Sequence, residues 1–528
     1  MASIGLRTAA VRPGEQRRVI LAASLGTVFE WYDFYLYGSL AIFFGALFFP
    51  PGNETAAFLA SLATFGAGFA VRPFGALVFG RLGDIVGRKH AFLLTILVMG
   101  VSTAAVGLLP TYDQIGLWAP ALLMLLRLAQ GLALGGEYGG AATYVAEHAP
   151  AGRRGLHTSW IQTTATLGFF LSLAVIYVCR QVIGDEDFKV WGWRIPFLAS
   201  VALLAISTYI RLQLKESPLF TELQAQGRTS RNPLTESFAR WKNLKGVLIA
   251  LLGATAGQGV VWYTGQFYAL FFMQNTLKMD YEAAYPLIAF TLLMSTPLFL
   301  FFGWLSDKVG RKPIMIAGCL LCAATCIPIF QSLTHAANPA LARALAISPV
   351  TLIGGGTCTT FYMTAPETPC DMARDYLSRA GIGYRVEPGD ALEIRIGSRS
   401  LAGFNEEELE HALAEAGYPA VADPKQIDRP AVVALLSLLM LYVAMVYGPI
   451  AAFLVELFPT RIRYTSMSLP YHLGNGWFGG FLPFIAFALV VQTGDLYYGL
   501  WYPIVVAVFT VAVSLIAIRE TKDRDLAR

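Results

Sequence analysis

The chain has 528 residues, of which 55% are hydrophobic and only 14% are charged, and its mean hydropathy is +0.55. Soluble domains have roughly a quarter of their residues charged, so this balance excludes an ordinary soluble enzyme and indicates a protein solvated by lipid. The formal net charge is +4, but the basic residues lie in short clusters between apolar runs. That pattern argues against a nucleic-acid partner.

Apolar stretches of about 20 residues, each long enough to cross the hydrocarbon core, recur along the chain. They predict an all-α polytopic membrane protein with twelve transmembrane helices. The first six are expected near 19–49, 57–81, 90–110, 117–147, 157–182 and 193–214, and the other six near 244–273, 283–305, 313–331, 430–455, 464–492 and 498–518.

The loops that alternate between these helices differ in their content of Lys and Arg. Cytoplasmic loops hold the excess of basic residues. We therefore expect the protein in the plasma (inner) membrane, with both termini in the cytoplasm. No cleavable signal is expected, because the first apolar segment is too long for one. The basic side comprises the N-terminal tail, Arg81, Arg88, Lys89, Arg153, Arg154, the 211–245 loop, Lys308, Arg311, Lys312, Arg461, Arg463, Arg519, Lys522 and Arg524.

Two pairs of matching loops predict an internal repeat. GRLGDIVGRK from Gly80 matches GWLSDKVGRK from Gly303, and EHAPAGRRG from Glu147 matches ELFPTRIRY from Glu456. The second pair is farther apart than the first, which predicts two six-helix halves with an insertion between helices 9 and 10. The expected segments are the tail 1–18, the first half 19–214, the cytoplasmic linker 215–243, helices 7 to 9 in 244–331, the insert 332–429, helices 10 to 12 in 430–518, and the tail 519–528.

The insert is expected on the outer side and to fold as a small α/β domain. DMARDYLSRAG reads as a helix, YRVEPGDALEIRIG as a strand or hairpin, and NEEELEHALAEAGY as a second helix. An oxidising compartment permits a disulfide between Cys358 and Cys370. The other four cysteines, which include Cys319 and Cys322, read as small buried hydrophobes, and no metal site is expected.

The matching Gly80 and Gly303 loops each carry an Asp and an Arg at the same spacing. These residues are Asp84 and Arg88 in the first half, and Asp307 and Arg311 in the second. Such pairs can bridge helix ends and form a cytoplasmic gate. The alternative is that they only set topology.

Ionisable residues at the middle of the membrane are costly and therefore usually functional. With a rise of about 1.5 Å per residue, Glu30, Arg72 and Glu137 are expected near one depth, with Asp33 close to Glu30 and Arg127 nearer the outer side. Glu30, Asp33 or Glu137 is expected to carry a proton, and Arg72 and Arg127 to bind a substrate carboxylate. The alternative is a static buried ion pair.

Aromatic and amide residues supply candidates for the lining of a cavity. Gln258, Trp262, Tyr263 and Gln266 form one polar face of the seventh helix, although Gln and Tyr can equally serve as bonds between helices. Trp31 and Tyr32 stand beside the acidic residues of the first helix. They can stack on a quaternary ammonium or simply pack in the core.

Several segments resemble the major facilitator superfamily, and within it the metabolite:proton symporter family. They are GTVFEWYDFYLYGSLA, RLAQGLALGGEYGGAATYVAEHAPAGRRG, WGWRIPF, KESPLF and AGQGVVWYTGQFY. The resemblance covers all twelve expected helices. It implies transport with protons of metabolites such as 2-oxoglutarate, citrate, shikimate, proline or glycine betaine, while the insert departs from the compact members.

These patterns predict a secondary transporter and not an enzyme: a symporter of a small organic acid or zwitterion that works by alternating access. No cofactor is expected apart from the coupling proton, and we expect a monomer. The alternatives are a transporter-like sensor that uses the insert, and a proton-driven exporter.

Overall fold

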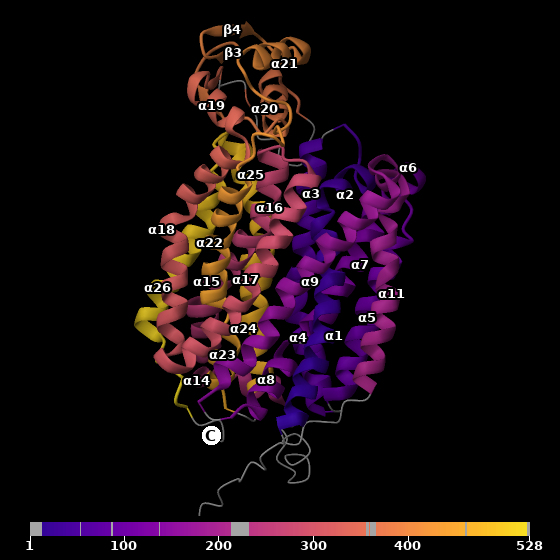
Figure 1. The fold of residues 1–528 in the computed structure, drawn as a ribbon, viewed down its shortest axis with the longest axis vertical. Helices are drawn as coiled ribbons and strands as arrows, with labels where there is room; N and C mark the ends of the chain where they lie inside the picture. Colours follow the sequence, from indigo (N-terminus) through magenta and orange to yellow (C-terminus); the bar gives the residue numbers. More distant parts are fainter. Residues whose placement is uncertain are drawn as a thin grey trace, which may run out of the picture.

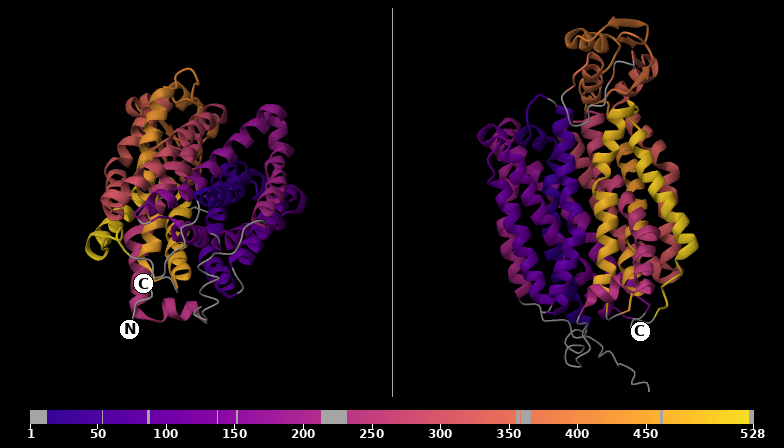
Figure 2. Two further views of the ribbon diagram at one scale, coloured as in Figure 1. Left: turned by 60° about the horizontal axis from the view of Figure 1, so that its bottom comes forward. Right: turned by 180° about the vertical axis from the view of Figure 1, so that it is seen from behind.

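The computed structural model describes residues 13–52, 54–85, 88–136, 138–150, 152–212, 232–354, 358, 366–459 and 462–524. Two bundles of long helices stand side by side, and a small mixed domain lies over one end of the second bundle (Figure 1). The view from behind separates the early helices of the first bundle from the late helices of the second (Figure 2).

The first bundle contains helices that are interrupted where the sequence predicted continuous spans. Pro73 has no N–H and lies in the first turn of a new helix, so the span expected at 57–81 divides after Ala70. The bundle comprises α1 Pro13–Ser39, α2 Ala41–Phe48, α3 Glu54–Ala70, α4 Arg72–Ile85, α5 Arg88–Gly107, α6 Tyr112–Ile115, α7 Trp118–Gly135, α8 Tyr138–His148, α9 Arg154–Ile183, α10 Asp185–Asp187, η1 Phe188–Gly192 and α11 Arg194–Leu212.

The second bundle includes several π-helical turns, of which η2, η3 and η7 contain glycine. It comprises α13 Pro233–Phe238, α14 Trp241–Ala250, η2 Leu251–Thr255, α15 Ala256–Tyr263, η3 Thr264–Tyr268, α16 Ala269–Phe271, η4 Phe272–Thr276, α17 Tyr281–Val309, α18 Arg311–Ala337, α22 Arg429–Tyr447, α23 Ile450–Leu457, α24 Arg463–Leu473, η7 Gly474–Gly480, α25 Leu482–Thr493, η8 Tyr498–Leu500 and α26 Trp501–Ala517. Helix α13 lies within the segment that the sequence predicted as a linker.

Glycine allows the closest helix crossings. A Cβ atom on Gly131 of α7 would lie 1.6 Å from the carbonyl oxygen of Gly68 in α3, and one on Gly259 of α15 would lie 2.4 Å from the carbonyl oxygen of Gly474. Small residues let helix backbones approach one another inside membranes. One of these close crossings lies within the first bundle and the other within the second.

Nine helices of the described residues are long and apolar enough to cross a membrane, or ten if the pair Asp185–Gly192 and Arg194–Tyr209, bent by 62°, counts as one span. The protein is therefore a helical, multi-pass membrane protein. The spans are Glu54–Leu82, Trp118–Glu147, Arg154–Ile183, Trp241–Thr276, Tyr281–Val309, Arg311–Ala337, Arg429–Leu457, Arg463–Thr493 and Tyr498–Ala517.

Between α18 and α22 the chain forms a mixed sheet in the order β2-β1-β3-β4, flanked by helices. Strand β1 pairs in parallel with β2 and antiparallel with β3. Of the two readings of YRVEPGDALEIRIG, a strand or a hairpin, the hairpin is wrong, because β1 lies between the two strands that the segment forms. The hairpin instead joins β3 to β4 through Gly397, whose φ of +56° suits a two-residue turn. The elements are α19 Pro339–Ile347, β1 Val350–Ile353, α20 Pro369–Arg379, β2 Tyr384–Glu387, β3 Glu393–Ile396, β4 Arg399–Ala402 and α21 Glu406–Glu415.

This insert is attached to the second bundle by several hydrogen bonds. The N–H of Tyr384 donates to the carbonyl of Gly494 (2.9 Å), and Arg374 Nη2 donates to the carbonyl of Gln492 (2.9 Å). Helix α20 presents its apolar face to α3 and α25. A disulfide between Cys358 and Cys370 ties the loop after β1 to the first turn of α20.

Candidate functional site

Arg72 begins α4 and lies where the two bundles face each other. Its side chain is 0% exposed, and among the described residues none of its three guanidinium nitrogens has a hydrogen-bond partner. The guanidinium lies over the rings of Phe69, Phe34 and Trp31, at 3.9, 4.6 and 5.1 Å from their centroids. Cation–π contacts thus surround a charge whose donors remain available.

The second bundle brings polar rings toward the same arginine. The side chains of Tyr263, Tyr447 and Tyr471 lie within electrostatic range of Arg72, as does the imidazole of His472. The hydroxyls of Tyr447 and Tyr471 are 2.8 Å apart. Arg72 is therefore surrounded by polar rings that come from both halves.

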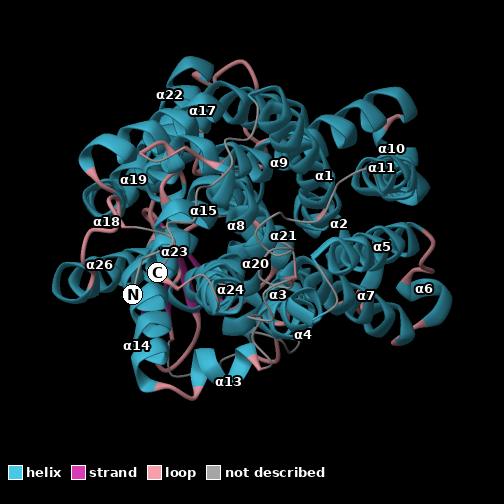
Figure 3. Ribbon diagram, turned by 90° about the horizontal axis from the view of Figure 1, so that it is seen from below, coloured by secondary structure: helices cyan, strands magenta, loops and turns pink. Residues whose placement is uncertain are grey.

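A further network crosses between the halves on the side away from the insert. Tyr138 of α8 stacks on Tyr471 of α24 with centroids 3.5 Å apart, and Gln162 Nε2 of α9 donates to the hydroxyl of Tyr138 (2.7 Å). The view from below shows α8, α23 and α24 near the centre of the molecule, where the halves meet (Figure 3). The stacked rings of Tyr138 and Tyr471 therefore join the two halves near Arg72.

Trp262 and Gln266 of the seventh expected span lie in the same interior. The ring of Trp262 stacks on Tyr35 of α1 at 5.6 Å, and Tyr35 stacks on Trp31 at 5.0 Å. In the part of the chain that the structure describes, Trp262 Nε1 and both amide atoms of Gln266 lack a hydrogen-bond partner although both side chains are buried. Buried polar atoms are normally paired, so these atoms mark a place that a polar ligand would complete.

The acidic residues of α1 lie in the first bundle. Glu30 and Asp33 are each 5% exposed, and Thr103 of α5 hydrogen-bonds to the carboxylate of Asp33. Their depth predicted a carboxylate partner for Arg72, whose guanidinium instead contacts rings among the described residues. Glu137, the third candidate, lies outside the described residues.

Arg127 is held within the first bundle. Its Nη1 donates to Gln130 Oε1 at 2.6 Å and to the carbonyl of Phe34 at 3.4 Å, and its guanidinium lies over the ring of Tyr37 at 4.5 Å. Gln130 in turn donates to Thr103. Its Nε and Nη2 have no hydrogen-bond partner among the described residues, so Arg127 is partly paired where Arg72 is unpaired.

Two other predicted lining residues have partners of their own. Tyr32 donates from its hydroxyl to the carbonyl of Pro196 in α11 (2.8 Å), inside the first bundle. Gln258 and Asn475 exchange two amide hydrogen bonds of 3.0 Å each. Gln258 thus follows the alternative interpretation, a bond between helices. Tyr263 contacts Phe69 edge-on across the two halves.

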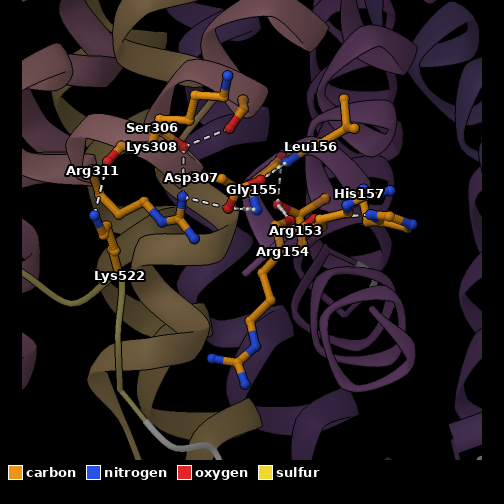
Figure 4. A network of polar contacts seen from close by, with 12 residues as sticks. Arg153, Arg154, Gly155, Leu156, His157, Ser306, Asp307, Lys308, Arg311 and Lys522 are labelled. Carbon is orange, nitrogen blue, oxygen red and sulfur yellow. Dashed lines mark hydrogen bonds and ion pairs between the residues drawn. The ribbon is translucent and has the colours of Figure 1, made fainter. Parts of the chain in front are cut away.

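At the end opposite the insert, Asp307 joins the halves (Figure 4). Its two carboxylate oxygens accept the backbone N–H groups of Gly155 and Leu156, at 2.8 and 2.9 Å, in the first turn of α9. Arg311 Nη1 lies 2.7 Å from the same carboxylate. A carboxylate at a helix N-terminus is stabilised by the helix dipole, so this contact joins α17 to the start of α9 at the end opposite the insert.

Arg311 links Asp307 to Glu456 and to the C-terminal segment. Its guanidinium donates to Glu456 at 3.1 and 3.3 Å, and the hydroxyl of Thr521 donates to the same carboxylate at 2.9 Å. Glu520 accepts the N–H of Arg311 (2.9 Å). Burial favours a higher pKa for Glu520, but backbone N–H donors, led by that of Arg311, outweigh burial and lower the pKa below its usual range. The side chains of Asp84 and Arg88, the matching pair, lie outside the described residues.

Six residues of this interior were not predicted as site residues from the sequence. Tyr35 was within reach of that reasoning, because it follows Trp31 by one helical turn on the same face. Tyr138 directly follows the candidate Glu137 in the sequence, and the other four lie in spans for which the sequence named no mid-membrane charge. The six are Tyr35, Tyr138, Gln162, Tyr447, Tyr471 and His472.

Comparisons with known proteins agree with this architecture. The family model of sugar (and other) transporters matches residues 19–247. A putative metabolite transport protein of Haemophilus influenzae is 30% identical over 515 residues, which cover 97% of this chain and 96% of that protein. The chain belongs to the major facilitator superfamily of metabolite transporters. Its relatives are membrane transporters and not enzymes.

Other relatives match over shorter lengths. The proline/betaine transporter of Salmonella typhimurium is 36% identical over 331 residues, which cover 60% of this chain and 65% of that protein. The alpha-ketoglutarate permease of Escherichia coli is 34% identical over 362 residues, 68% of this chain and 82% of the permease. The proton:xylose symporter XylE bound to 6-bromo-6-deoxy-D-glucose shares the fold, with a TM-score of 0.64, 17% identity and 98% coverage of each chain.

Proposed function

We propose that this protein is a proton-coupled symporter that imports a small organic acid or zwitterion by alternating access of its two halves. The single observation that carries the proposal is Arg72: a guanidinium that is fully buried between the halves, with no hydrogen-bond partner among the described residues. A planar guanidinium binds a carboxylate through two parallel hydrogen bonds. A substrate carboxylate would satisfy the donors that the protein leaves unpaired.

The surrounding rings favour a substrate with a compact, weakly polar or cationic body. Trp31, Tyr35 and Trp262 form a stack beside Arg72, and such faces bind ammonium groups as well as apolar ones. Trp262 Nε1 and the amide of Gln266 add donors and an acceptor. The names of the relatives, which include transporters of proline/betaine, alpha-ketoglutarate and shikimate, fit a substrate of this class.

For the proton we propose a carboxylate of the first half, with Glu30, Asp33 and Glu137 as the candidates. Glu30 and Asp33 are buried in the first bundle, where a change of charge is strongly coupled to hydration and to the position of neighbouring helices. Opening of one side of the molecule would change the hydration of these groups. That coupling supports the binding and release of a proton in each cycle.

We further propose twelve spans, with α1 and α5 completing the set of nine spans and one bent pair. The insert 332–429 would then lie outside the cell between spans nine and ten, and both termini would lie in the cytoplasm, as the distribution of Lys and Arg supports. We propose that transport needs no cofactor apart from the coupling proton, and that the transport unit is a monomer.

Uptake into proteoliposomes with an imposed inward proton gradient tests the function. The panel comprises 2-oxoglutarate, shikimate, proline and glycine betaine, each radiolabelled. We expect gradient-driven accumulation of at least one of them, abolished by a protonophore. Efflux driven by the same gradient would identify an exporter instead, and binding without movement would identify a sensor.

Neutral variants test the proton carrier. The variants are Glu30→Gln, Asp33→Asn and Glu137→Gln. We expect that one of the three still binds substrate and exchanges it across the membrane but no longer accumulates it against a gradient. Normal accumulation in all three variants would overturn the assignment of the proton to these carboxylates.

A further inference from the structure

A cavity of about 470 Å³ lies at the outer end of the molecule, where both halves and the insert meet. Its walls come from the segment between α2 and α3, the segment that follows η4, helix α20 with the start of β2, and helix α25. The volume is that of a small-molecule site. Since the described insert forms one wall, a transporter without the insert would lack this enclosed space.

The insert approaches the second half closely enough to seal one edge of this cavity. Gly381 has a φ of +70°, and a Cβ atom there would lie 2.2 Å from the carbonyl oxygen of Thr276. Only glycine fits both the conformation and the contact. The position of the insert is therefore fixed against the rim of the second half.

Three charged residues from three parts of the fold line the cavity: Glu54 of α3, Lys278 after η4, and Arg379 at the end of α20. Arg379 forms ion pairs with Asp375 (2.9 Å) and with Glu54 (3.5 Å). Lys278 is partly buried, and the described partner of its ammonium is the carbonyl of Arg379. An ammonium held mainly by a neutral carbonyl keeps the capacity to bind an anion.

The rest of the wall is apolar, with rings from both halves. Phe49 and Phe58 come from the first half, Phe487 from α25, and Ile382 from the insert.

At the charged edge, Arg379 is paired with the carboxylates of Glu54, Asp375 and Glu406. The structure gives the ammonium of Lys278 no carboxylate partner among the described residues. This edge and the apolar walls are complementary to a small molecule that has one carboxylate and a largely apolar body. Inorganic anions would leave the apolar wall without a contact.

We propose that this outer cavity is a second binding site, which captures a small organic carboxylate through Lys278 and Arg379 before it enters the path between the halves. The inference rests on the proposed function, because it places the site on the route of an imported substrate. The first half contributes Glu54, whose pair with Arg379 a bound carboxylate would loosen. The insert thereby becomes part of substrate recognition.

Direct binding separates this site from the central one. The Arg72→Ala protein in lipid nanodiscs, titrated calorimetrically with 2-oxoglutarate, shikimate, proline and glycine betaine, is expected to retain weak binding of at least one carboxylate. Choline and prolinamide, which lack the carboxylate, are the matched ligands that should not bind. Addition of Lys278→Met should weaken the retained binding about tenfold, the effect of one lost charge-assisted hydrogen bond, and Lys278→Arg should restore it.

Transport provides the second measurement. Lys278→Met should raise the KM for uptake from the outer face about tenfold, while the KM for efflux from the inner face stays the same. Two results would overturn the outer site. One is that the Arg72→Ala protein binds carboxylates equally well with and without Lys278→Met. The other is that folded Arg72→Ala protein binds no carboxylate at all. If no ligand of the panel is transported but carboxylates bind at Lys278, the transport proposal fails and the outer site stands.

Discussion

At the scale of single residues, the molecule separates two kinds of buried arginine. Arg127 has hydrogen bonds from Nη1 to Gln130 and to a backbone carbonyl, and its Nε and Nη2 are unpaired among the described residues. Arg72 has ring contacts, and all three of its guanidinium nitrogens are unpaired there. Removing one member of a buried hydrogen-bond network is costly to stability. The proposed binding role therefore falls first on Arg72, because Arg127 is tied to its own bundle.

Substitution of each arginine by lysine tests this difference. Arg72→Lys keeps the charge but loses the planar fork, so we expect the Kd of the transported ligand to rise at least about tenfold with little change in thermal stability. Arg127→Lys is the matched control and should lower the Tm while leaving the Kd within about twofold. Unchanged affinity in Arg72→Lys would contradict the carboxylate site.

The outer cavity predicts a dependence of uptake on external pH. Burial is the main cause that lowers the pKa of Lys278, to about 8, with Glu54 raising it and Arg379 lowering it further. The ammonium is the anion-binding form, so it is present below pH 8 and is lost as the pH rises through 8. With the proton gradient held constant, the KM for uptake should rise between external pH 7 and 9.

Lys278→Arg is the control for this pH effect, because its guanidinium stays charged over the whole range. Its KM should be independent of external pH between 7 and 9. The same rise in KM in Lys278→Arg and in the unsubstituted protein would assign the effect to another group.

At the scale of elements, contacts at helix ends decide which side of the transporter is open. The N-terminus of α9 meets Asp307, and a Cβ atom on Gly155 would lie 2.3 Å from the carbonyl oxygen of Gly303. Helices α9 and α17 therefore meet so closely here that no side chain fits at position 155.

A small wedge should therefore open the gate. Gly155→Ala would separate α9 from α17, so we expect the cytoplasmic path to be labelled faster by a membrane-impermeant thiol reagent at a cysteine introduced for Ser159, by about tenfold. Gly246→Ala, whose added Cβ atom would meet only the ring of Phe458 at 3.4 Å, is the control for a glycine substitution without a steric clash. Equal labelling in the two variants would contradict the gate.

The disulfide of the insert gives a further prediction for a single element. Closing a loop of this size stabilises a domain by about 3 kcal/mol, because Cys358 and Cys370 are 12 residues apart. Cys358→Ser with Cys370→Ser should increase hydrogen exchange in β1 and β2 and leave α22 unchanged. Cys179→Ser, which removes a free cysteine, should have no such effect, and unaltered exchange in the double variant would show that the disulfide is dispensable.

Much of this architecture follows from local sequence patterns, and the remainder depends on contacts between distant segments. Apolar run lengths and basic clusters predict the spans, and the paired Asp and Arg motif led to the Asp307 contact. The interruption of α7 and α8 and the order of the strands do not follow from local pattern, since β1 pairs with residues far along the chain. In a chain with 13% aromatic residues, nothing local distinguishes Tyr447 or Tyr471 from core packing.

At the scale of the whole molecule, the two halves meet through rings and through several polar contacts, which include the ion pairs of Arg463 with Glu147 (3.2 Å) and of Arg154 with Glu456 (3.8 Å). The hydroxyl of Tyr285 in α17 donates to the carbonyl of Ser39 in α1 on the outer side (2.9 Å), while Asp307 joins the halves on the inner side. Interfaces of this kind switch between discrete packed arrangements. In the described conformation the halves are therefore in contact near both ends.

The attachment of the insert has a practical consequence for imaging. Multi-pass proteins with short loops are nearly featureless once a micelle surrounds them, and computational alignment of single particles suffers. Here Arg374, Tyr384 and Asp428 fasten a compact lobe to the second bundle by bonds to backbone carbonyls, and Arg379 adds an ion pair with Glu54 of the first bundle. An antibody fragment raised against that lobe would give each particle an asymmetric marker, from which its orientation can be assigned.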